Sequence, residues 1–269
     1  MNYKMIVLDL DGTLTNRDKE ITPRTREVLM EAQRQGKIVV LASGRPTQGV
    51  APLARELELE KYGSYILSYN GGMITNCRTG KTVAAALLPP EINRKVIGLA
   101  REQQVNILTY EKDTIITLKK KDPYVELEAQ TNQMKIKEVS DMENYVEFAV
   151  PKFLMVDDGD YLAMVEPRVK AALGRDFSVY RSDPFFLEIL PKGIDKAKRL
   201  EVLLEILGIS REEMIACGDG YNDLSMIRFA GLGVAMGNAV LPVRNAADYI
   251  TGTNDEDGVA QVVEKFMLS

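Results

Sequence analysis

The first third of the chain alternates short apolar runs with amphipathic segments. Apolar runs of the length of buried strands lie at residues 5–8, 38–41 and 65–68. Between the first two runs, residues 23–35 have the pattern of a helix, with Thr22 at the N-cap, Pro23 at the first position and Gly36 as the stop. Apolar residues at positions 50, 53, 54 and 57 have the spacing of a second helix. This order of elements predicts a parallel sheet with right-handed crossovers.

The pattern changes near Met73. Two short runs, 73–75 and 82–83, flank a turn at Thr79 and Gly80, which predicts a hairpin that leaves the sheet. From there to about Ser182 the elements come in mixed order, with helices expected near residues 92–104, 124–132 and 162–173 and strands near 107, 115, 153–156, 179 and 187. Helices segregated from mostly antiparallel strands indicate a separate α+β unit.

After Leu190 the alternation of strands and helices returns. The expected elements are helices at 196–207, 223–230, near 242–246 and after 258, and strands at 214–217 and 232–235. We therefore expect an α/β fold with a doubly wound, Rossmann-like parallel-sheet core formed by residues 1–83 and 184–269. An α+β cap domain of residues 84–183 is expected to be inserted into it.

The composition is that of a globular protein without a cationic surface. Of the 269 residues, 45% are hydrophobic and 27% charged, and 34 Lys and Arg against 39 Asp and Glu leave a formal charge of −5. This excludes a global cationic field for nucleic acid or an anionic membrane. Asp9 comes too soon for a signal peptide, and the uncharged stretch between Arg228 and Arg244 contains glycines and falls short of the ~20 apolar residues of a membrane span. We expect a cytoplasmic protein with two reduced thiols, Cys77 and Cys217.

The chain contains no histidine. This excludes Ser-His-Asp triads, Cys-His dyads, H-E-x-x-H zinc sites and a phosphohistidine. Any general acid or base must therefore be a carboxylate, a lysine or a tyrosine.

Polar residues follow several of the expected strands. These segments are Asp9-Leu10-Asp11-Gly12-Thr13, Ser43-Gly44-Arg45 and Gly218-Asp219-Gly220-Tyr221-Asn222-Asp223, and Lys196 stands at a helix start. Ligands of open parallel sheets bind beyond the carboxyl ends of the strands, so these segments predict one site.

Together these segments favour a phosphate and metal site, although Ser43-Gly44 alone has the pattern of an ordinary β-to-α turn. Asp9 and Asp11 repel each other unless a cation lies between them, and a hard cation such as Mg²⁺ takes carboxylate oxygens, with Asp219 as a further ligand. A hydroxyl and a glycine N–H at 43–44 suit phosphate oxygens. Lys196 lies where the helix dipole disfavours a cation, which indicates an anion nearby. Asn222 and Asp223 also have the pattern of a helix cap, which is compatible with a role in the site.

Taken together, these segments resemble the four motifs of haloacid dehalogenase-superfamily phosphatases, and the insertion resembles that of the Cof-type subfamily. The likeness extends over essentially the whole chain and includes Ser68-Tyr69-Asn70-Gly71 and residues 231–238. One departure is Ala197, where related sequences more often have glycine after the motif lysine.

The resemblance implies a role for each motif residue. Asp9 is the expected nucleophile, which forms an aspartyl-phosphate, and Asp11 the expected general acid and base. Asp9, Asp11 and Asp219 are the expected Mg²⁺ ligands, Asp11 through its backbone carbonyl. The residues expected to hold the phosphoryl oxygens are Leu10, Ser43, Gly44, Lys196 and Asn222. Thr13 and Asp223 support them, and Arg45 and Asn70 are candidate substrate contacts.

The expected function is that of a Mg²⁺-dependent phosphatase that hydrolyses a small phosphorylated metabolite. A sugar phosphate is the favoured substrate class, and no obligate protein partner is expected. The inserted unit would set substrate choice. A receiver-type signalling domain is disfavoured because it is about half as long and carries its phosphorylated aspartate after a middle strand. A non-catalytic regulatory protein that binds sugar phosphates remains the alternative, although it would have little use for Asp11 as acid and base.

Overall fold

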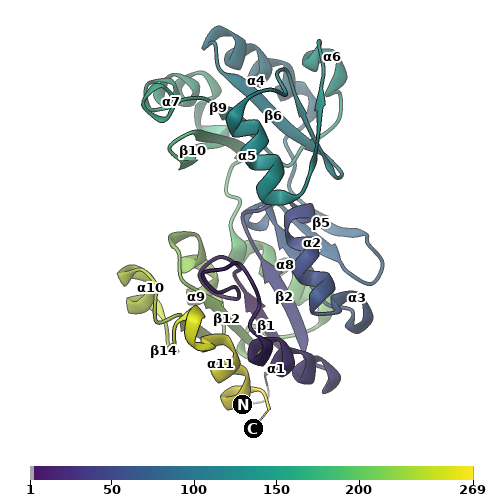
Figure 1. Ribbon diagram of the computed structural model, residues 1–269, viewed down its shortest axis with the longest axis vertical. Helices are drawn as coiled ribbons and strands as arrows, with labels where there is room; N and C mark the ends of the chain where they lie inside the picture. The colour runs from purple at the N-terminus through teal and green to yellow at the C-terminus, as the bar shows by residue number, and fades with distance from the viewer. Residues whose placement is uncertain (1–2, 269) are drawn as a thin grey trace. The chain divides into compact units, whose positions relative to one another are not determined.

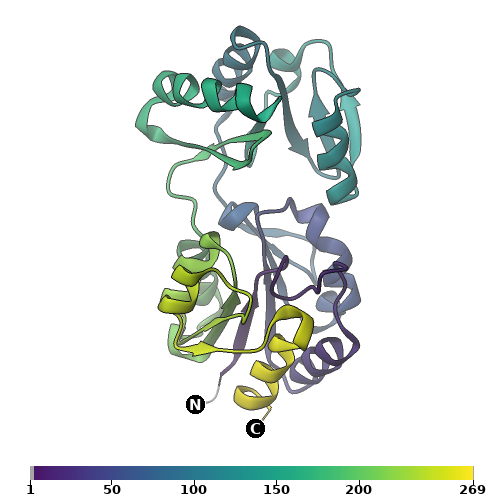
Figure 2. The ribbon, with the colours of Figure 1, turned by 60° about the vertical axis from the view of Figure 1, so that its left-hand side comes forward.

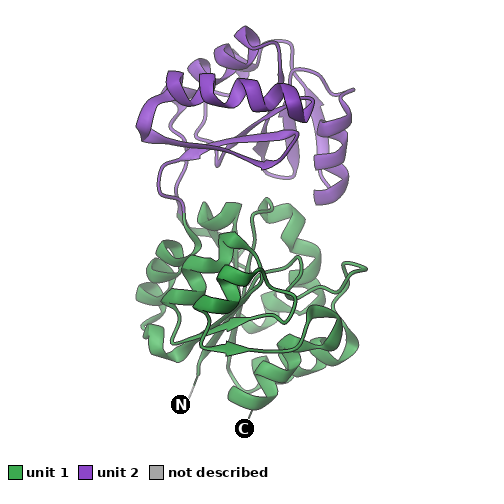
Figure 3. Cartoon of the chain, turned by 90° about the vertical axis from the view of Figure 1, so that its left-hand side faces the viewer, with its two compact units in different colours: residues 1–84, 195–269 green, residues 85–194 purple. Residues whose placement is uncertain are grey.

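The computed structural model describes residues 3–268 and divides into two compact units (Figure 3). Unit 1 combines the chain up to Ala84 with the chain from Asp195 onward, and unit 2 is Ala85–Ile194. The sequence pattern predicts the return to the core at residue 184. The structure places it later because β11 (Phe186–Pro191) pairs antiparallel with two other strands of unit 2 and cannot leave that sheet.

Unit 1 is built on an eight-stranded sheet of order β14-β13-β12-β1-β2-β3-β4-β5. All neighbours from β14 to β3 pair in parallel. The strands are β1 (Met5–Leu8), β2 (Ile38–Ala42), β3 (Tyr65–Ser68), β4 (Met73–Asn76), β5 (Thr82–Ala85), β12 (Met214–Gly218), β13 (Leu232–Ala235) and β14 (Tyr249–Ile250). The chain runs outward from β1 in both directions, which confirms the doubly wound fold and puts the switch in strand order at β1.

The hairpin after β3 was expected to leave the sheet, and this is wrong. β4 pairs antiparallel with β3, and β5 extends the same sheet as its edge. The edge of β3 thereby obtains partners for its backbone N–H and C=O groups.

Helices cover both faces of this sheet (Figures 1 and 2). They are α1 (Pro23–Arg34), α2 (Thr47–Glu56), α3 (Leu59–Tyr62), α8 (Lys196–Leu207), α9 (Leu224–Phe229), α10 (Leu241–Ala246) and α11 (Gly258–Phe266). Ile6 and Leu8 pack in one apolar cluster with residues of α1 and α11, whereas Met5 and Val7 pack in another with residues of α8. Successive side chains of a strand point to opposite faces, so the continuous apolar run of β1 serves both layers.

The helices expected at residues 23–35 and 196–207 begin at the predicted residues, Pro23 and Lys196. Thr22 caps α1 by accepting a hydrogen bond from the N–H of Thr25. Asp195 caps α8 by accepting from the N–H of Lys198, and Gly208 ends α8 in the left-handed conformation at φ 63°.

Unit 2 is an α+β unit, as expected. Its six-stranded sheet has the order β10-β11-β9-β6-β7-β8, and only the β7–β8 pair is parallel. Its other strands are β6 (Asn106–Glu111), β7 (Thr114–Thr117), β8 (Lys135–Glu138), β9 (Phe153–Val156) and β10 (Phe177–Asp183). Its helices are α4 (Pro90–Glu102), α5 (Pro123–Asn132), α6 (Met142–Tyr145) and α7 (Gly159–Leu173). One apolar cluster joins α4 and α7 to the sheet. In the described part of the chain, no helix is long and apolar enough to cross a bilayer.

Candidate active site

The predicted site residues meet at the carboxyl ends of β12, β1 and β2, which are neighbours in the sheet. Asp9 follows β1, Ser43 follows β2 and Asp219 follows β12. The N–H of Asp9 donates to the carbonyl of Cys217 at 3.1 Å, which continues the β1–β12 pairing one residue beyond the strand. Parallel pairing therefore brings together residues that are about 200 positions apart in the sequence.

Lys196, the first residue of α8, lies at the centre of the site. Its Nζ donates to Asp9 Oδ1 at 2.7 Å, to Asp223 Oδ1 at 2.6 Å and to the carbonyl of Ala42 at 3.0 Å, and its side chain is fully buried. Burial opposes the charge, but the Asp223 and Asp9 carboxylates prevail and raise the pKa of Lys196 above its ordinary value. The lysine is therefore a permanent cation with three acceptors.

Asp223 uses both of its carboxylate oxygens inside the protein. Besides the bond from Lys196, its Oδ2 accepts the N–H of Asp219 at 3.0 Å and the N–H of Gly220 at 2.9 Å. A Cβ on Gly218 would lie 2.5 Å from the Cβ of Asp223, so only glycine allows this approach. Asp223 thus orients the segment that carries Asp219 and the lysine that faces Asp9.

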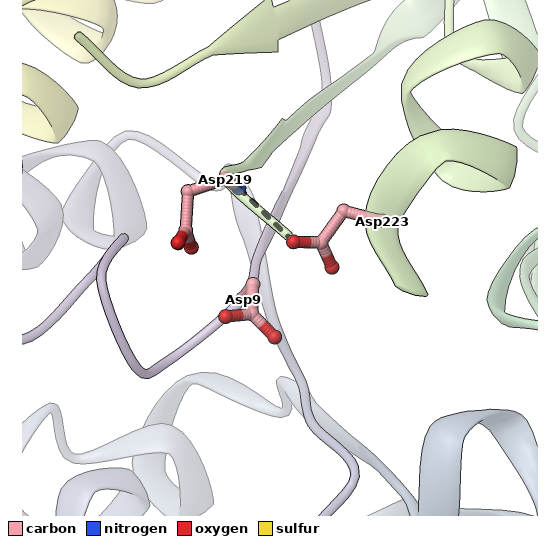
Figure 4. Close-up of side chains that lie close together, drawn as sticks. All are labelled: Asp9, Asp219 and Asp223. Carbon is pink, nitrogen blue, oxygen red and sulfur yellow. Dashed lines mark hydrogen bonds between the residues drawn. The ribbon is translucent and has the colours of Figure 1, made fainter. Parts of the chain in front are cut away.

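Three carboxylates gather around one point (Figure 4). Asp9, Asp219 and Asp223 each offer an oxygen within 4.8 Å of the others. Burial, followed by the charge of Asp223, raises the pKa of Asp9 to about 8, although Lys196 opposes this shift. Burial and Asp223 also raise the pKa of Asp219. One lysine does not compensate these carboxylates, and an all-oxygen donor set fits a hard divalent cation.

The loop after β1 lies directly against Asp219. Thr13 Oγ1 donates to Asp219 Oδ1 at 2.8 Å. Gly12 has φ 84°, and a Cβ on it would lie 2.5 Å from Asp219 Oδ2. Asn238 Nδ2 holds the carbonyl of Gly12 at 2.8 Å. Asn238 is not among the site residues predicted from the sequence, although a polar residue shortly after β13 has the same strand-end signal as the motifs.

Asp11 belongs to a different set of contacts. Its carboxylate accepts from Arg45 Nε at 2.9 Å, Arg45 Nη2 at 2.6 Å and Lys19 Nζ at 2.8 Å. Although partial burial opposes it, these hydrogen bonds hold the pKa of Asp11 below its ordinary value. Arg45 therefore contacts Asp11 directly. Lys19 was not predicted from the sequence. Its backbone has φ 63°, which is rare for a lysine and which no sequence pattern indicated.

The remaining predicted residues lie close together beside β2 and β3. Ser43 Oγ accepts from the N–H of Arg45 at 3.2 Å. Asn222 Nδ2 donates to Asn70 Oδ1 at 3.2 Å, and the Asn70 amide packs against Gly44. A hydroxyl, a close glycine and two amides thus lie at the same sheet edge as the acidic cluster.

Residues 6–263 match the haloacid dehalogenase-like hydrolase family. The match covers both units, so the chain belongs to this family, and the resemblance found in the four motifs is confirmed. It is an enzyme, a phosphatase of this family. This outcome disfavours the alternative of a non-catalytic regulatory protein.

Individual relatives agree with this assignment. The chain is 31% identical over 268 residues to the Bacillus subtilis protein named "Putative phosphatase YxeH", with 99% of each chain covered. A crystal structure of a haloacid dehalogenase-like hydrolase from Bacteroides thetaiotaomicron is 53% identical with a TM-score of 0.94, covering 98% of this chain and 99% of that one. The subclass IIB sugar phosphatase BT4131 is 25% identical with a TM-score of 0.79, covering 98% of both chains.

Proposed function

We propose that this enzyme is a Mg²⁺-dependent phosphatase that hydrolyses a small sugar phosphate through an aspartyl-phosphate on Asp9. The observation that carries the proposal is the buried Asp9 carboxylate. It is paired with Lys196 at 2.7 Å and lies next to Asp219 at the carboxyl ends of β1 and β12. A sugar phosphate is supported by the structural likeness to a sugar phosphatase. The free thiols of Cys77 and Cys217 support a cytoplasmic location.

The donor set fits Mg²⁺, which prefers oxygen ligands and usually keeps several waters. The carboxylates of Asp9 and Asp219 and the backbone carbonyl of Asp11 would hold the ion. Asp223 is left as a support because both of its oxygens already accept hydrogen bonds. When bound, the ion supplies positive charge that offsets the carboxylates and the phosphoryl group.

The first chemical step forms the covalent intermediate. A carboxylate oxygen of Asp9 attacks the phosphorus, the new O–P bond forms, and the bond between phosphorus and the leaving oxygen breaks. Asp11 donates a proton to that leaving oxygen, which departs as an alcohol. Since an ionised carboxylate is already a nucleophile, no histidine is needed.

The second step regenerates the enzyme. Asp11, now ionised, accepts a proton from a water molecule whose oxygen attacks the phosphorus, and the bond to Asp9 breaks to release inorganic phosphate. The bonds from Arg45 and Lys19 favour the ionised form of Asp11 that this step requires. At least one of the hydrogen bonds from Arg45 and Lys19 must break when Asp11 carries the proton that it donates in the first step.

The hydrogen-bond donors that would hold the phosphoryl oxygens lie near the carboxyl ends of the same strands. These are the N–H groups of Leu10 and Gly44, the Ser43 hydroxyl, the Asn222 amide and Lys196, which must exchange one of its three present acceptors for a phosphoryl oxygen. Fixed donors of this kind stabilise the charge that spreads over the oxygens in the transition state. We assign Arg45 as a candidate substrate contact and unit 2 as the cap that sets specificity.

Hydrolysis of p-nitrophenyl phosphate tests the proposal. Turnover is expected with Mg²⁺, to be lost on chelation with EDTA and to return on adding Mg²⁺. Asp9→Asn is expected to abolish turnover, and Asp11→Asn to lower kcat by about 10²- to 10⁴-fold. The control is Glu31→Gln, a carboxylate-to-amide change on the surface of α1 that is expected to keep wild-type turnover.

Full activity in metal-free buffer would overturn the metal requirement, and wild-type turnover in Asp9→Asn would reassign the nucleophile. A panel of phosphorylated sugars, nucleotides and cofactors tests the substrate class. A clear preference for a phosphate outside the sugars would contradict that part of the proposal.

A further inference from the structure

The chain makes an unusual turn directly after β3. Three consecutive residues have positive φ, namely Tyr69 at 54°, Asn70 at 55° and Gly71 at 100°. Two of them carry a Cβ, which disfavours this conformation. Backbone strain of this kind persists only where the surrounding structure holds it, and it gathers at functional sites.

The turn fixes the backbone on both sides of Gly44. The N–H of Asn70 donates to the carbonyl of Ser43 at 2.9 Å, and the N–H of Tyr69 donates to the carbonyl of Arg45 at 3.0 Å. These two hydrogen bonds fix the carbonyls of Ser43 and Arg45, the residues on either side of Gly44. The Gly44 N–H makes no hydrogen bond among residues 3–268 and is left for a ligand.

The side chain of Asn70 contacts the same segment and a second one. Its Nδ2 and Oδ1 lie 3.0 and 3.2 Å from the position that a Cβ on Gly44 would take, so the amide rests on the glycine backbone. Its Oδ1 accepts a hydrogen bond from Asn222 Nδ2 at 3.2 Å. One amide therefore connects the segment after β2 with the segment after β12.

We propose that Asn70 is a positioning residue of the phosphate site, which holds Gly44 and Asn222 so that their N–H groups meet the same phosphoryl group. The backbone N–H groups of the turn hold the segment around Gly44, and the side-chain amide of Asn70 contacts Gly44 and Asn222. The inference rests on the proposed function, and it differs from a direct substrate contact because it acts through Asn222 and Gly44.

Substitutions of Asn70 separate the contribution of the left-handed backbone from that of the side-chain amide. Asn70→Gly keeps the left-handed backbone available but removes the amide, whereas Asn70→Ala removes the amide and strains the backbone. Glu58→Gly is the matched control, because Glu58 has nearly the same conformation, φ 51° and ψ 37°, at the start of α3 in the same unit. Full-length Asn70→Gly is expected to fold with wild-type Tm.

The main readouts are hydrolysis of p-nitrophenyl phosphate with Mg²⁺ and binding of inorganic phosphate by calorimetry. Asn70→Gly is expected to lower kcat by about 10- to 100-fold and to weaken phosphate binding, with the Mg²⁺ activation constant unchanged. Asn70→Ala is expected to have a lower kcat, weaker phosphate binding and a lower Tm than Asn70→Gly. Glu58→Gly is expected to match the wild type.

A double-mutant cycle with Asn222→Ala tests whether Asn70 acts through its neighbour. The loss caused by Asn70→Gly is expected to shrink several-fold when Asn222→Ala is already present. Wild-type kcat and phosphate affinity in Asn70→Gly, or fully additive losses in the cycle, would overturn the proposal.

Failure of the proposed function gives a different result, namely no Mg²⁺-dependent turnover by the wild type itself. Phosphate binding by Asn70→Gly then still decides the role of Asn70.

Discussion

The buried charges around Lys196 are expensive to keep in a folded protein. Asp9 and Asp223 each place an oxygen within 2.7 Å of its Nζ, and Asp219 adds a third carboxylate nearby. Burial of ionised groups costs free energy unless partners compensate it, and one cation does not compensate three anions. The metal-free site therefore stores unfavourable electrostatic energy, which a divalent cation would relieve.

Asp9 makes this energy measurable as a dependence of stability on pH. Its pKa is raised from 3.8 to about 8 in the folded state, so the folded protein binds this proton more tightly than the unfolded chain. The contribution of Asp9 to the free energy of unfolding is thus full at acid pH and is lost as pH rises from about 4 to about 8. In EDTA, Asp9→Asn is expected to remove this loss and to raise Tm at pH 8 by about 2–6 °C relative to the wild type.

The measurement is thermal unfolding of both proteins between pH 5 and 9, with Glu31→Gln as the control. Adding Mg²⁺ at pH 8 is expected to stabilise the wild type more than Asp9→Asn. Parallel Tm curves for the wild type and Asp9→Asn across this range would show that Asp9 does not carry the raised pKa.

At the scale of elements, the loop after β1 determines where Asp219 lies. Thr13 donates to Asp219, Asn238 holds the carbonyl of Gly12, and Gly12 itself fills a space in which a Cβ would collide. One hydrogen bond from Thr13 and the close approach of Gly12, whose carbonyl Asn238 holds, therefore constrain the Asp219 carboxylate. Loops of this kind position catalytic groups on a rigid sheet.

Gly12→Ala tests this arrangement. A Cβ would lie 2.5 Å from Asp219 Oδ2 on a backbone at φ 84°, so Asp219 must shift. The Mg²⁺ activation constant is expected to rise at least about tenfold, since metal affinity depends on ligand placement. The matched control is Gly80→Ala, at φ 65° with nothing within 4 Å of its Cβ position.

Gly80→Ala is expected to lose about 1 kcal/mol of stability through backbone strain and to keep wild-type activation by Mg²⁺. Titration of activity with Mg²⁺ and thermal unfolding of both variants give the comparison. An unchanged activation constant in Gly12→Ala would mean that Asp219 tolerates the displacement.

At the scale of the whole molecule, the two units have separate cores. Two apolar clusters lie entirely in unit 1 and one lies entirely in unit 2. All twelve candidate site residues named from the sequence lie in unit 1, so the proposed chemistry uses no residue of 85–194. Units with their own cores are able to fold alone.

Replacing residues 86–194 by a short Gly/Ser linker tests the division of labour. Unit 1 is expected to fold and to hydrolyse p-nitrophenyl phosphate with Mg²⁺, but to lose the ranking of sugar phosphates that the full enzyme shows. The cut keeps β5 complete at Ala85. If the folded variant ranks substrates as the parent does, specificity resides in unit 1 and unit 2 is not its source.

Local signals in the sequence were sufficient for much of the fold and for predicting which segments meet at the candidate site. The capped helices α1 and α8 and the apolar strands β3, β9 and β13 lie where the pattern predicts them. The motif residues could be grouped because parallel strands end at one edge of a sheet. These features depend on short-range propensity and on a general rule of topology.

Only the tertiary structure decided the features that depend on distant partners. β8, with the sequence Lys-Ile-Lys-Glu, has a single apolar residue and is a strand only because it pairs with β7. The late return to unit 1 follows from the pairing of β11, and the roles of Lys19, Asn70 and Asn238 follow from contacts with other segments. No local pattern contains such contacts, since each exists only when chain folding brings two remote segments together.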